Sequence, residues 1–321
     1  MKDIKILIIT QEFTRVVLPI SNNYKVVGIV NCIDSNFFFK KSLRFCINIL
    51  VGFFNLIFLN KQTSLYLFCL LRRIKYFNWN KSNKSKLIRF IKKTNPDLII
   101  VYSSSRLLSK DIYDLPRFGT INLHPSILPK YRGPFPEFWH YYNMDLNSGV
   151  TVHYIDSGVD TGDILFQESV ILPLGIKSKD RDDIVIGYLG VNGLLKVITS
   201  ILNNSIVRIS QKNNINYEYS RRIKIFEHKD IIKWEEWPIE RIWNLLRGTE
   251  GWLKCLPEMN GIWKGQFWII CDYVKFENSE FDYRKINKNL DGAFFIELRD
   301  GIIFLKKKWS WTNFIKYVIG V

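Results

Sequence analysis

The chain has 321 residues, of which 47% are hydrophobic and 15% aromatic, and it carries a formal net charge of +16. This apolar content excludes a disordered chain and is sufficient for two folded domains. The charge suits an anionic partner such as nucleic acid, a membrane surface or a phosphorylated substrate, although AT-rich coding sequence, with its many Lys, Asn and Ile codons, would produce it too.

The cysteines and the apolar segments bear on location. Five scattered cysteines lack the spacing of a zinc site or a disulfide framework, which favours a reducing, cytoplasmic location and no bound metal. Residues 1–10 lack the features of a signal peptide. The apolar stretch 45–59 is shorter than the ~20 residues of a spanning helix and contains polar Asn48 and Asn55, so we predict a buried helix and no membrane partner.

Apolar runs and amphipathic stretches alternate along the first half of the chain. The stretch 43–76 is apolar almost all round and predicts helix, and further helices are predicted between the capping residues 80–85 and Pro96 and at 107–113. Such alternation is typical of an open, mostly parallel α/β sheet with helices on both faces. The predicted buried strands are 5–10, 26–32, 98–102 and 120–123.

The second half changes character after a strand pair. Residues 150–155 and 164–171 predict a hairpin-like pair, and 180–202 predicts a helix that packs on the sheet. Short aromatic-rich strands near the carboxyl end are typical of a small or partial β-barrel, such as an OB-like domain. We therefore predict a catalytic domain at 1–205 and a β-rich domain at 206–321.

Familiar phosphate-binding and hydrolase motifs are absent. The first predicted strand is followed by Thr10-Gln11-Glu12-Phe13, without the glycines of a dinucleotide site. Neither a P-loop nor a nucleophile elbow occurs. These absences leave the chemistry to other segments.

The segment INLHPSILPKYRGPFP, at 121–136, is the first of two that indicate chemistry. Alternate strand residues point to one face, so Asn122 and His124 should project together from the carboxyl end of a strand, where open α/β sheets bind ligands. Taken alone, a strand histidine such as His124 is more often a packed core residue, but Asn122 two residues before it and the Pro-rich loop after it favour a functional role. The Pro-rich loop that follows should display Lys130, Tyr131 and Arg132.

The second segment is DSGVDTGD, at 156–163, with three carboxylates in one glycine-containing turn. It lacks the register of a calcium loop. A general base, or a charge partner for His124, is the better interpretation, and the residues themselves leave open which carboxylate serves.

The pair INLHPSILPKYRG and GVTVHYIDSGVDTGDIL resembles the formyltransferase family that uses N10-formyltetrahydrofolate. That family includes methionyl-tRNA formyltransferase, glycinamide ribonucleotide transformylase and the sugar N-formyltransferases. The resemblance implies a catalytic trio of Asn122, His124 and Asp160. It further implies a formyl-donor site and an acceptor site. We also expect a homodimer, although the Trp and Tyr residues of the carboxyl-terminal region could equally form a dimer contact or stack on a nucleotide base. The expected donor-site residues are Tyr102, Ser103, Arg106 and Asp163, and the expected acceptor-site residues are Ser126, which would also brace its loop, Lys130, Tyr131 and Arg132.

The acceptor amine is predicted from what the chain lacks. The tRNA branch should carry a basic, glycine-rich insertion that grips the acceptor stem, whereas residues 36–76 are apolar and contain a single glycine. The purine-pathway branch should be shorter. A nucleotide-linked amino sugar is therefore the expected partner, rather than nucleic acid. A methionyl-tRNA formyltransferase and an inactive ligand-binding homologue are the alternatives.

Overall fold

The computed structural model describes residues 2–12, 14–32, 64–211, 219–277, 281–283, 285–311, 313–314 and 317. The chain forms two compact units, and each draws on separated stretches of sequence, whereas the predicted domains were contiguous. The first comprises Met1–Gly133, Gly149–Ser169 and Asp183–Tyr219, and the second comprises Pro134–Ser148, Val170–Asp182 and Ser220–Val321. The apolar stretch 45–59 lies outside the described residues.

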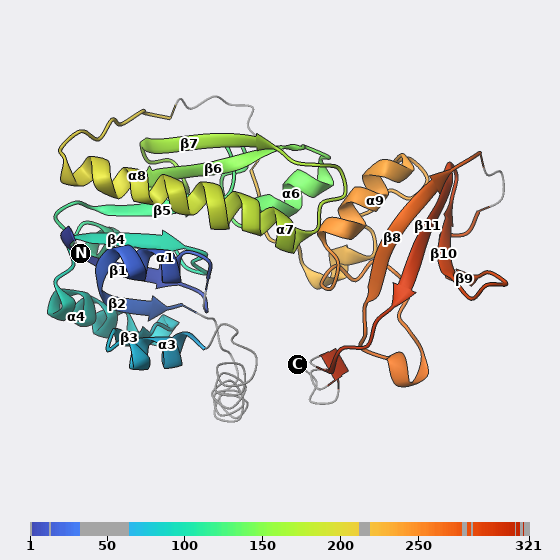
Figure 1. Cartoon of the computed structure of the whole chain (residues 1–321), viewed down its shortest axis with the longest axis horizontal. Helices are drawn as coiled ribbons and strands as arrows, with labels where there is room; N and C mark the ends of the chain where they lie inside the picture. The colour runs from blue at the N-terminus through green and yellow to red at the C-terminus, as the bar shows by residue number, and fades with distance from the viewer. Residues whose placement is uncertain are drawn as a thin grey trace. The chain divides into compact units, whose positions relative to one another are not determined.

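A seven-stranded sheet organises the first unit, with the strand order β3-β2-β1-β4-β5-β6-β7 (Figure 1). Strands β1 to β5 pair in parallel and β6 runs antiparallel to β5. The predicted open, mostly parallel sheet is confirmed. Its strands are β1 (Lys2–Thr10), β2 (Tyr24–Asn31), β3 (Lys75–Asn78), β4 (Leu98–Tyr102), β5 (Thr120–His124), β6 (Asn147–Tyr154) and β7 (Ile164–Ile171).

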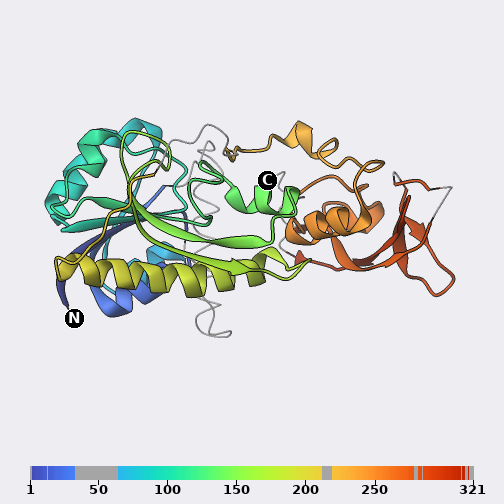
Figure 2. The ribbon, with the colours of Figure 1, turned by 90° about the horizontal axis from the view of Figure 1, so that it is seen from above.

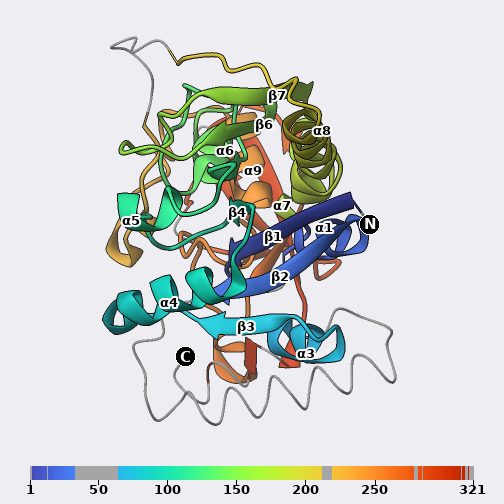
Figure 3. The same ribbon diagram turned by 90° about the vertical axis from the view of Figure 1, so that its left-hand side faces the viewer.

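Helices cover both faces of this sheet, with α1 and α8 on one face and α4 and α5 on the other (Figure 3). Continuous apolar strands such as β4 are buried on both faces for this reason. The helical elements of this unit are α1 (Val17–Asn23), α3 (Leu65–Leu71), η1 (Lys81–Asn83), α4 (Lys84–Thr94), α5 (Lys110–Tyr113), η2 (Asp183–Gly190, a π-helical segment) and α8 (Val191–Leu202).

Within the described part of 43–76, the predicted helix is present as α3 (Leu65–Leu71), and the prediction is wrong only for the residues that follow it. Helix α3 ends at Leu71, Arg73 adopts a left-handed conformation with φ 55°, and β3 follows at the edge of the sheet. An edge strand needs few buried residues, and those of β3 are exposed or half-buried. The apolar content of β3 therefore gave no sign in the sequence that the helix ends before it.

Helix α8 lies close against the sheet, along which it runs in Figure 2. A Cβ atom on Gly193 would lie 2.5 Å from the ring of Phe166, and one on Gly190 would lie 2.8 Å from Leu123. Glycine at these positions therefore permits the close approach. Among the described residues, Ser178–Leu202 is long and apolar enough to cross a membrane, but 56% of its apolar window is buried in the protein, as in a core helix.

The second unit contains a four-stranded sheet of order β8-β11-β10-β9, antiparallel throughout. Helix α9 packs on it through Trp243 and Leu245, within an aromatic-rich core. The β-rich character is confirmed, and the described strands form an open sheet rather than a closed barrel. Its elements are α6 (Pro136–Tyr142), α7 (Ser178–Asp182), η3 (Ile225–His228), α9 (Ile239–Gly248), η4 (Gly261–Trp263), β8 (Trp268–Lys275), β9 (Asn287–Lys288), β10 (Phe294–Leu298) and β11 (Gly301–Lys307).

Candidate active site

Two predicted site residues lie at the carboxyl end of β5. Asn122 and His124 alternate on this strand, and the antiparallel register places Asn122 opposite His153 and His124 opposite Thr151 on β6. Strand β5 adjoins β4, and the strand order reverses direction between β1 and β4. This is the edge at which open α/β sheets bind their ligands.

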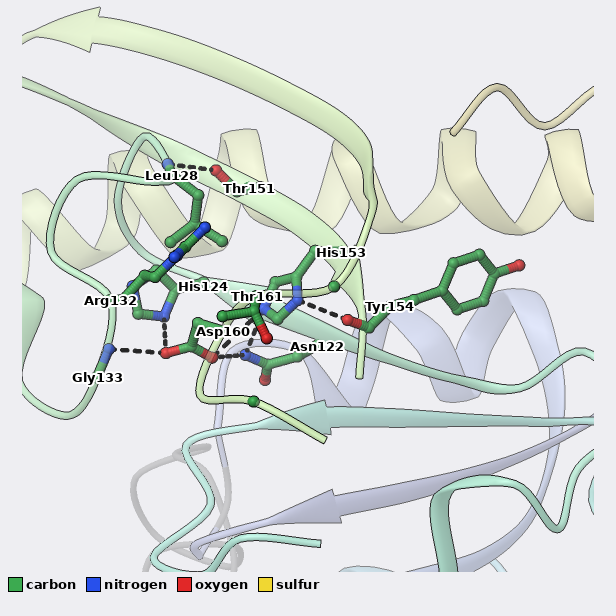
Figure 4. Close-up of polar contacts among 12 residues, drawn as sticks. Asn122, His124, Leu128, Arg132, Gly133, Thr151, His153, Tyr154, Asp160 and Thr161 are labelled. Carbon is green, nitrogen blue, oxygen red and sulfur yellow. Dashed lines mark hydrogen bonds and ion pairs between the residues drawn. The ribbon is translucent and has the colours of Figure 1, made fainter. Parts of the chain in front are cut away.

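Asp160 stands at the centre of a polar cluster (Figure 4). Its Oδ2 atom accepts a 2.8 Å hydrogen bond from the Gly133 amide and lies 3.5 Å from Nδ1 of His124. Its Oδ1 atom accepts from Nδ2 of Asn122 at 3.3 Å and lies 3.4 Å from Nε2 of His153. The structure thus brings together the three residues of the predicted trio.

The other two carboxylates of the 156–163 turn lie differently. Oδ1 of Asp156 accepts from the amide of Gly158 at 3.0 Å and from the hydroxyl of Thr161 at 2.6 Å, so it stabilises its own turn. The Asp163 carbonyl accepts from the amide of Tyr154. Asp160, with a left-handed φ of 52°, is the member of the turn that contacts His124.

His153 is a member of the cluster that the sequence analysis missed. Its Nδ1 donates to the Tyr154 carbonyl at 2.8 Å, because a carbonyl can only accept. Its Nε2, 3.1 Å from Nδ2 of Asn122, therefore accepts from that amide in the neutral ring. The signal that could have revealed it was its place on the strand that follows the Pro-rich loop, facing the Asn122 position.

Burial and neighbouring charges shift the pKa values of His124 and Asp160 in opposite directions. Burial lowers the pKa of His124 below its ordinary value, and the Asp160 carboxylate opposes this shift only in part. Burial raises the pKa of Asp160, but His124, His153 and the Gly133 amide together outweigh it and hold that pKa well below its usual range. At neutral pH the cluster therefore contains an ionised Asp160 and a neutral His124.

The neutral His124 ring carries its proton on Nε2. That atom lies 2.8 Å from the Tyr131 carbonyl oxygen, which can only accept. The unprotonated Nδ1 then faces Oδ2 of Asp160 at 3.5 Å. Uptake of a proton at Nδ1 would turn this contact into a buried ion pair, so the pair is built to receive one proton.

The ordinary pKa of a histidine is about 6.5. We expect His124 to be mostly neutral at that pH and to titrate at lower pH, because burial lowers its pKa. In an Asp160→Asn variant its pKa should fall further, since the carboxylate raises it more than the hydrogen bond to the Tyr131 carbonyl does. Side-chain NMR of the four histidines, assigned with a His124→Gln variant, measures both values. A His124 pKa at or above 6.5 in the native protein, or a rise in the variant, would contradict this electrostatic picture.

The Pro-rich loop is more buried than its composition suggests. The Ser126 hydroxyl donates to the Lys130 carbonyl at 2.8 Å, so Ser126 does brace the loop. Lys130 is exposed, but Tyr131 and Arg132 are only 1% and 6% exposed, so the expectation that the loop displays all three side chains is wrong. The Tyr131 carbonyl holds His124, and the Arg132 guanidinium binds Gln211. Their roles toward an acceptor stay predictions.

Three of the residues expected at the formyl-donor site lie at or after the carboxyl end of β4, and the fourth precedes β7. Tyr102 ends β4 beside Thr10 of β1, and Ser103 follows in a left-handed conformation with φ 58°. The Arg106 guanidinium lies 5.6 Å from the centre of the Trp79 ring. Asp163 immediately precedes β7. Contact of these residues with a folate stays a prediction.

The cluster supplies the parts that an acyl transfer to an amine needs. A tetrahedral intermediate requires hydrogen-bond donors for its oxyanion, and the attacking amine must lose a proton. The Asn122 amide is a neutral donor, and the His124–Asp160 pair is a buried proton acceptor. The geometry thus suits group transfer without a nucleophilic Ser or Cys.

Comparison with known proteins gives the family. Residues 57–179 match the family described as Formyl transferase. The methionyl-tRNA formyltransferase of Clostridium tetani is 34% identical over 229 residues, which cover 68% of this chain and 68% of that protein.

Two solved structures share the fold over nearly the whole chain. WlaRD, a sugar 3N-formyl transferase solved with dTDP and 5-N-formyl-THF, is 22% identical with a TM-score of 0.59, and the match covers 96% of this chain and 98% of that one. The N-formyltransferase of Helicobacter canadensis, solved with folinic acid and dTDP-3-aminofucose, is 22% identical with a TM-score of 0.57, at 95% and 100% coverage. The chain belongs to the formyltransferase family and is a formyl-group transferase that uses formyltetrahydrofolate.

Proposed function

We propose that the enzyme transfers the formyl group of N10-formyltetrahydrofolate to the amino group of a nucleotide-linked amino deoxysugar. A sugar such as dTDP-4-amino-4,6-dideoxyglucose, or its 3-amino analogue, would yield an N-formylated sugar for surface polysaccharide such as O-antigen. The observation that carries the proposal is the extent of the structural likeness. The match to WlaRD covers 96% of this chain and 98% of that one, so both units of this chain have a counterpart in a sugar N-formyltransferase.

The composition of residues 36–76 supports the sugar acceptor. A grip on the tRNA acceptor stem depends on Lys and Arg contacts to phosphates, and the resemblance to the tRNA branch leads us to expect them in a glycine-rich insertion. This stretch is mainly apolar and contains only one glycine, Gly52, and its seven Lys and Arg residues lie outside the apolar run 45–59. The second candidate is nevertheless methionyl-tRNA, which is favoured by the 34% identity to an enzyme of that name.

The catalytic step would begin with attack of the neutral amine on the formyl carbon. The carbonyl double bond opens, and the negative charge that develops on its oxygen is stabilised by an N–H of Asn122. In the structure this amide donates to His153 and Asp160, so one of these bonds would be exchanged for the oxyanion. His153 and Asp160 would thereby hold the amide in orientation until the substrate arrives.

The proton of the attacking amine would pass to the His124–Asp160 pair. Nδ1 of His124 faces Oδ2 of Asp160 at 3.5 Å, so a proton received by either atom is shared across the contact. Collapse of the intermediate then breaks the bond from the formyl carbon to N10 of the folate, and N10 takes up the proton. The products are an N-formyl sugar and tetrahydrofolate.

The acceptor test is a panel of amines with N10-formyltetrahydrofolate. We expect tetrahydrofolate release, and a sugar product heavier by the mass of CO, with dTDP-amino sugars but not with dTDP-glucose, which lacks the amine. Turnover with methionyl-tRNA alone would replace the sugar proposal with the second candidate. No turnover with any amine would favour a binding protein that has lost activity.

The homodimer and the cytoplasmic location remain proposals, and light scattering tests the dimer.

A further inference from the structure

The Gln211 side chain joins the two loops that meet at the catalytic cluster. Its Nε2 donates to the carbonyl oxygen of Asp160 at 3.0 Å and to that of Gly162 at 2.7 Å. Its Oε1 accepts from Nε and Nη2 of Arg132 at 3.1 and 2.7 Å. The two N–H groups of this carboxamide thus bind the loop that contains Asp160, and its oxygen accepts both hydrogen bonds from Arg132 on the Pro-rich loop.

The backbone next to Gln211 is itself fixed to the sheet. Ile209 forms an antiparallel bridge with Ile164, the first residue of β7, through reciprocal hydrogen bonds of 2.8 and 2.9 Å. Gln211 follows two residues later. Its carboxamide is therefore presented from a strand edge of the sheet that carries Asn122 and His124, and not from a free loop.

The Gln211 side chain binds residues that are part of, or adjacent in sequence to, the contacts of the catalytic cluster. Arg132 lies between Tyr131, whose carbonyl accepts from His124, and Gly133, whose amide donates to Asp160. At the other end, Gln211 holds the carbonyl of Asp160 itself, a residue with a left-handed φ of 52°. Holding that carbonyl fixes the peptide plane after Asp160 and so the direction of its carboxylate.

We propose that Gln211 and Arg132 form a positioning pair that sets the Asp160 carboxylate against His124 and the Gly133 amide. Neither side chain acts on the substrate. The assignment replaces the expected role of Arg132 as an acceptor-site residue, because the edge of the guanidinium bearing Nε and Nη2 is bound to Gln211 and the residue is 6% exposed. It rests on the proposed catalytic role of Asp160.

A positioning pair and an anion-binding arginine predict different kinetics. Displacement of a catalytic group by about 1 Å costs roughly 100-fold in rate, while substrate binding through other contacts is kept. Loss of an anion contact instead raises KM for the nucleotide sugar with little change in kcat. The double variant separates the two further, because groups that act as a unit are not additive.

The experiment uses the full chain with N10-formyltetrahydrofolate and dTDP-4-amino-4,6-dideoxyglucose, or whichever amine of the panel turns over. We expect Gln211→Ala and Arg132→Ala each to lower kcat by roughly 10- to 100-fold, with both KM values within about twofold. The kcat of the double variant should lie within about twofold of the kcat of the slower single variant. Gln266→Ala, at a buried glutamine that pairs with Ser310 in the second unit, is the matched control and should keep native kcat.

The Gln211→Glu variant tests the donor half of the bridge. A carboxylate can still accept from Arg132 but has no N–H for the carbonyls of Asp160 and Gly162. Its kcat should therefore fall at least as far as that of Gln211→Ala, although the Arg132 contact is kept. Affinity for 5-formyltetrahydrofolate, measured by calorimetry, should stay within about twofold in both variants and shows that the rest of the fold is intact.

Native kcat in Gln211→Glu, or an Arg132→Ala variant with raised KM for the sugar at native kcat, would overturn the assignment. The Asp160→Asn variant separates this failure from failure of the catalytic proposal. If Asp160→Asn is inactive while Gln211→Glu is native, only the positioning pair is wrong. If Asp160→Asn is itself native, the catalytic assignment on which the pair depends is wrong.

Discussion

Replacing Asp160 with asparagine is expected to lower kcat by about 10²- to 10⁴-fold, the range of a lost acid–base group. Asparagine keeps the shape of the side chain, and its carbonyl oxygen can still accept from the Gly133 amide. The change removes the negative charge 3.5 Å from Nδ1 of His124, so a proton taken up there no longer gains a counter-ion. The loss should appear in kcat at saturating concentrations of both substrates.

Asp156→Asn is the matched control for this variant. Asp156 lies in the same turn, but its carboxylate accepts from the amide of Gly158 and the hydroxyl of Thr161, bonds that an amide oxygen can retain. Its kcat should stay within about twofold of the native value. Equal losses in the two variants would assign the effect to the turn and not to the charge of Asp160. Native kcat in Asp160→Asn would remove it from the chemistry.

The parts of the fold that the sequence predicts well are those where local pattern and burial agree. Strands β4 and β7 occupy the predicted ranges 98–102 and 164–171, because their apolar or alternating residues match the positions they occupy in the sheet. Strand β3 was absorbed into a predicted helix, since Lys75–Asn78 is an edge strand whose pairing with β2, and not its own composition, makes it a strand. Pairing of this kind is decided by tertiary structure.

The candidate site divides in a similar way. Asn122 and His124 follow from strand periodicity, which places both side chains at one end of one strand. Asp160 was chosen among three carboxylates by resemblance alone, and the geometric reason is the left-handed backbone that turns it toward His124. His153 was missed because its place depends on cross-strand register, and Gln211 was missed because it lies just past the predicted domain boundary at residue 205.

The donor groups of the cluster are paired within the structure: the Asn122 and Gly133 amides donate to Asp160, and Nε2 of His124 donates to the Tyr131 carbonyl. The two imidazoles lie beside the same carboxylate, and polar groups of this kind are costly to bury when they lack partners. Pre-formed geometry of this kind reduces the reorganisation needed when charge develops on the formyl oxygen. For the same reason, removal of the neutral Asn122 amide should lower kcat strongly.

Asn122→Ala is expected to lower kcat by about 10²- to 10³-fold, the usual effect of removing one donor to an oxyanion. The amide acts on a charge that exists only in the transition state, so KM for the folate should change little and kcat and kcat/KM should fall together. The substitution also leaves Nε2 of His153 without its 3.1 Å donor. Asn147→Ala, at an exposed asparagine at the start of β6, controls for the loss of an amide side chain and should leave kcat native.

Two comparisons distinguish transition-state stabilisation from a purely structural effect of Asn122. A His153→Gln variant keeps a neutral side chain beside the Asn122 amide, and it should lose less activity than Asn122→Ala if the amide itself meets the oxyanion. The double variant Asn122→Ala/Asp160→Asn should lose less than the product of the two single effects, because both residues serve one step and are in contact. A raised KM at native kcat in Asn122→Ala would instead mean that the amide binds ground-state substrate, and the oxyanion role would have to be given to another donor.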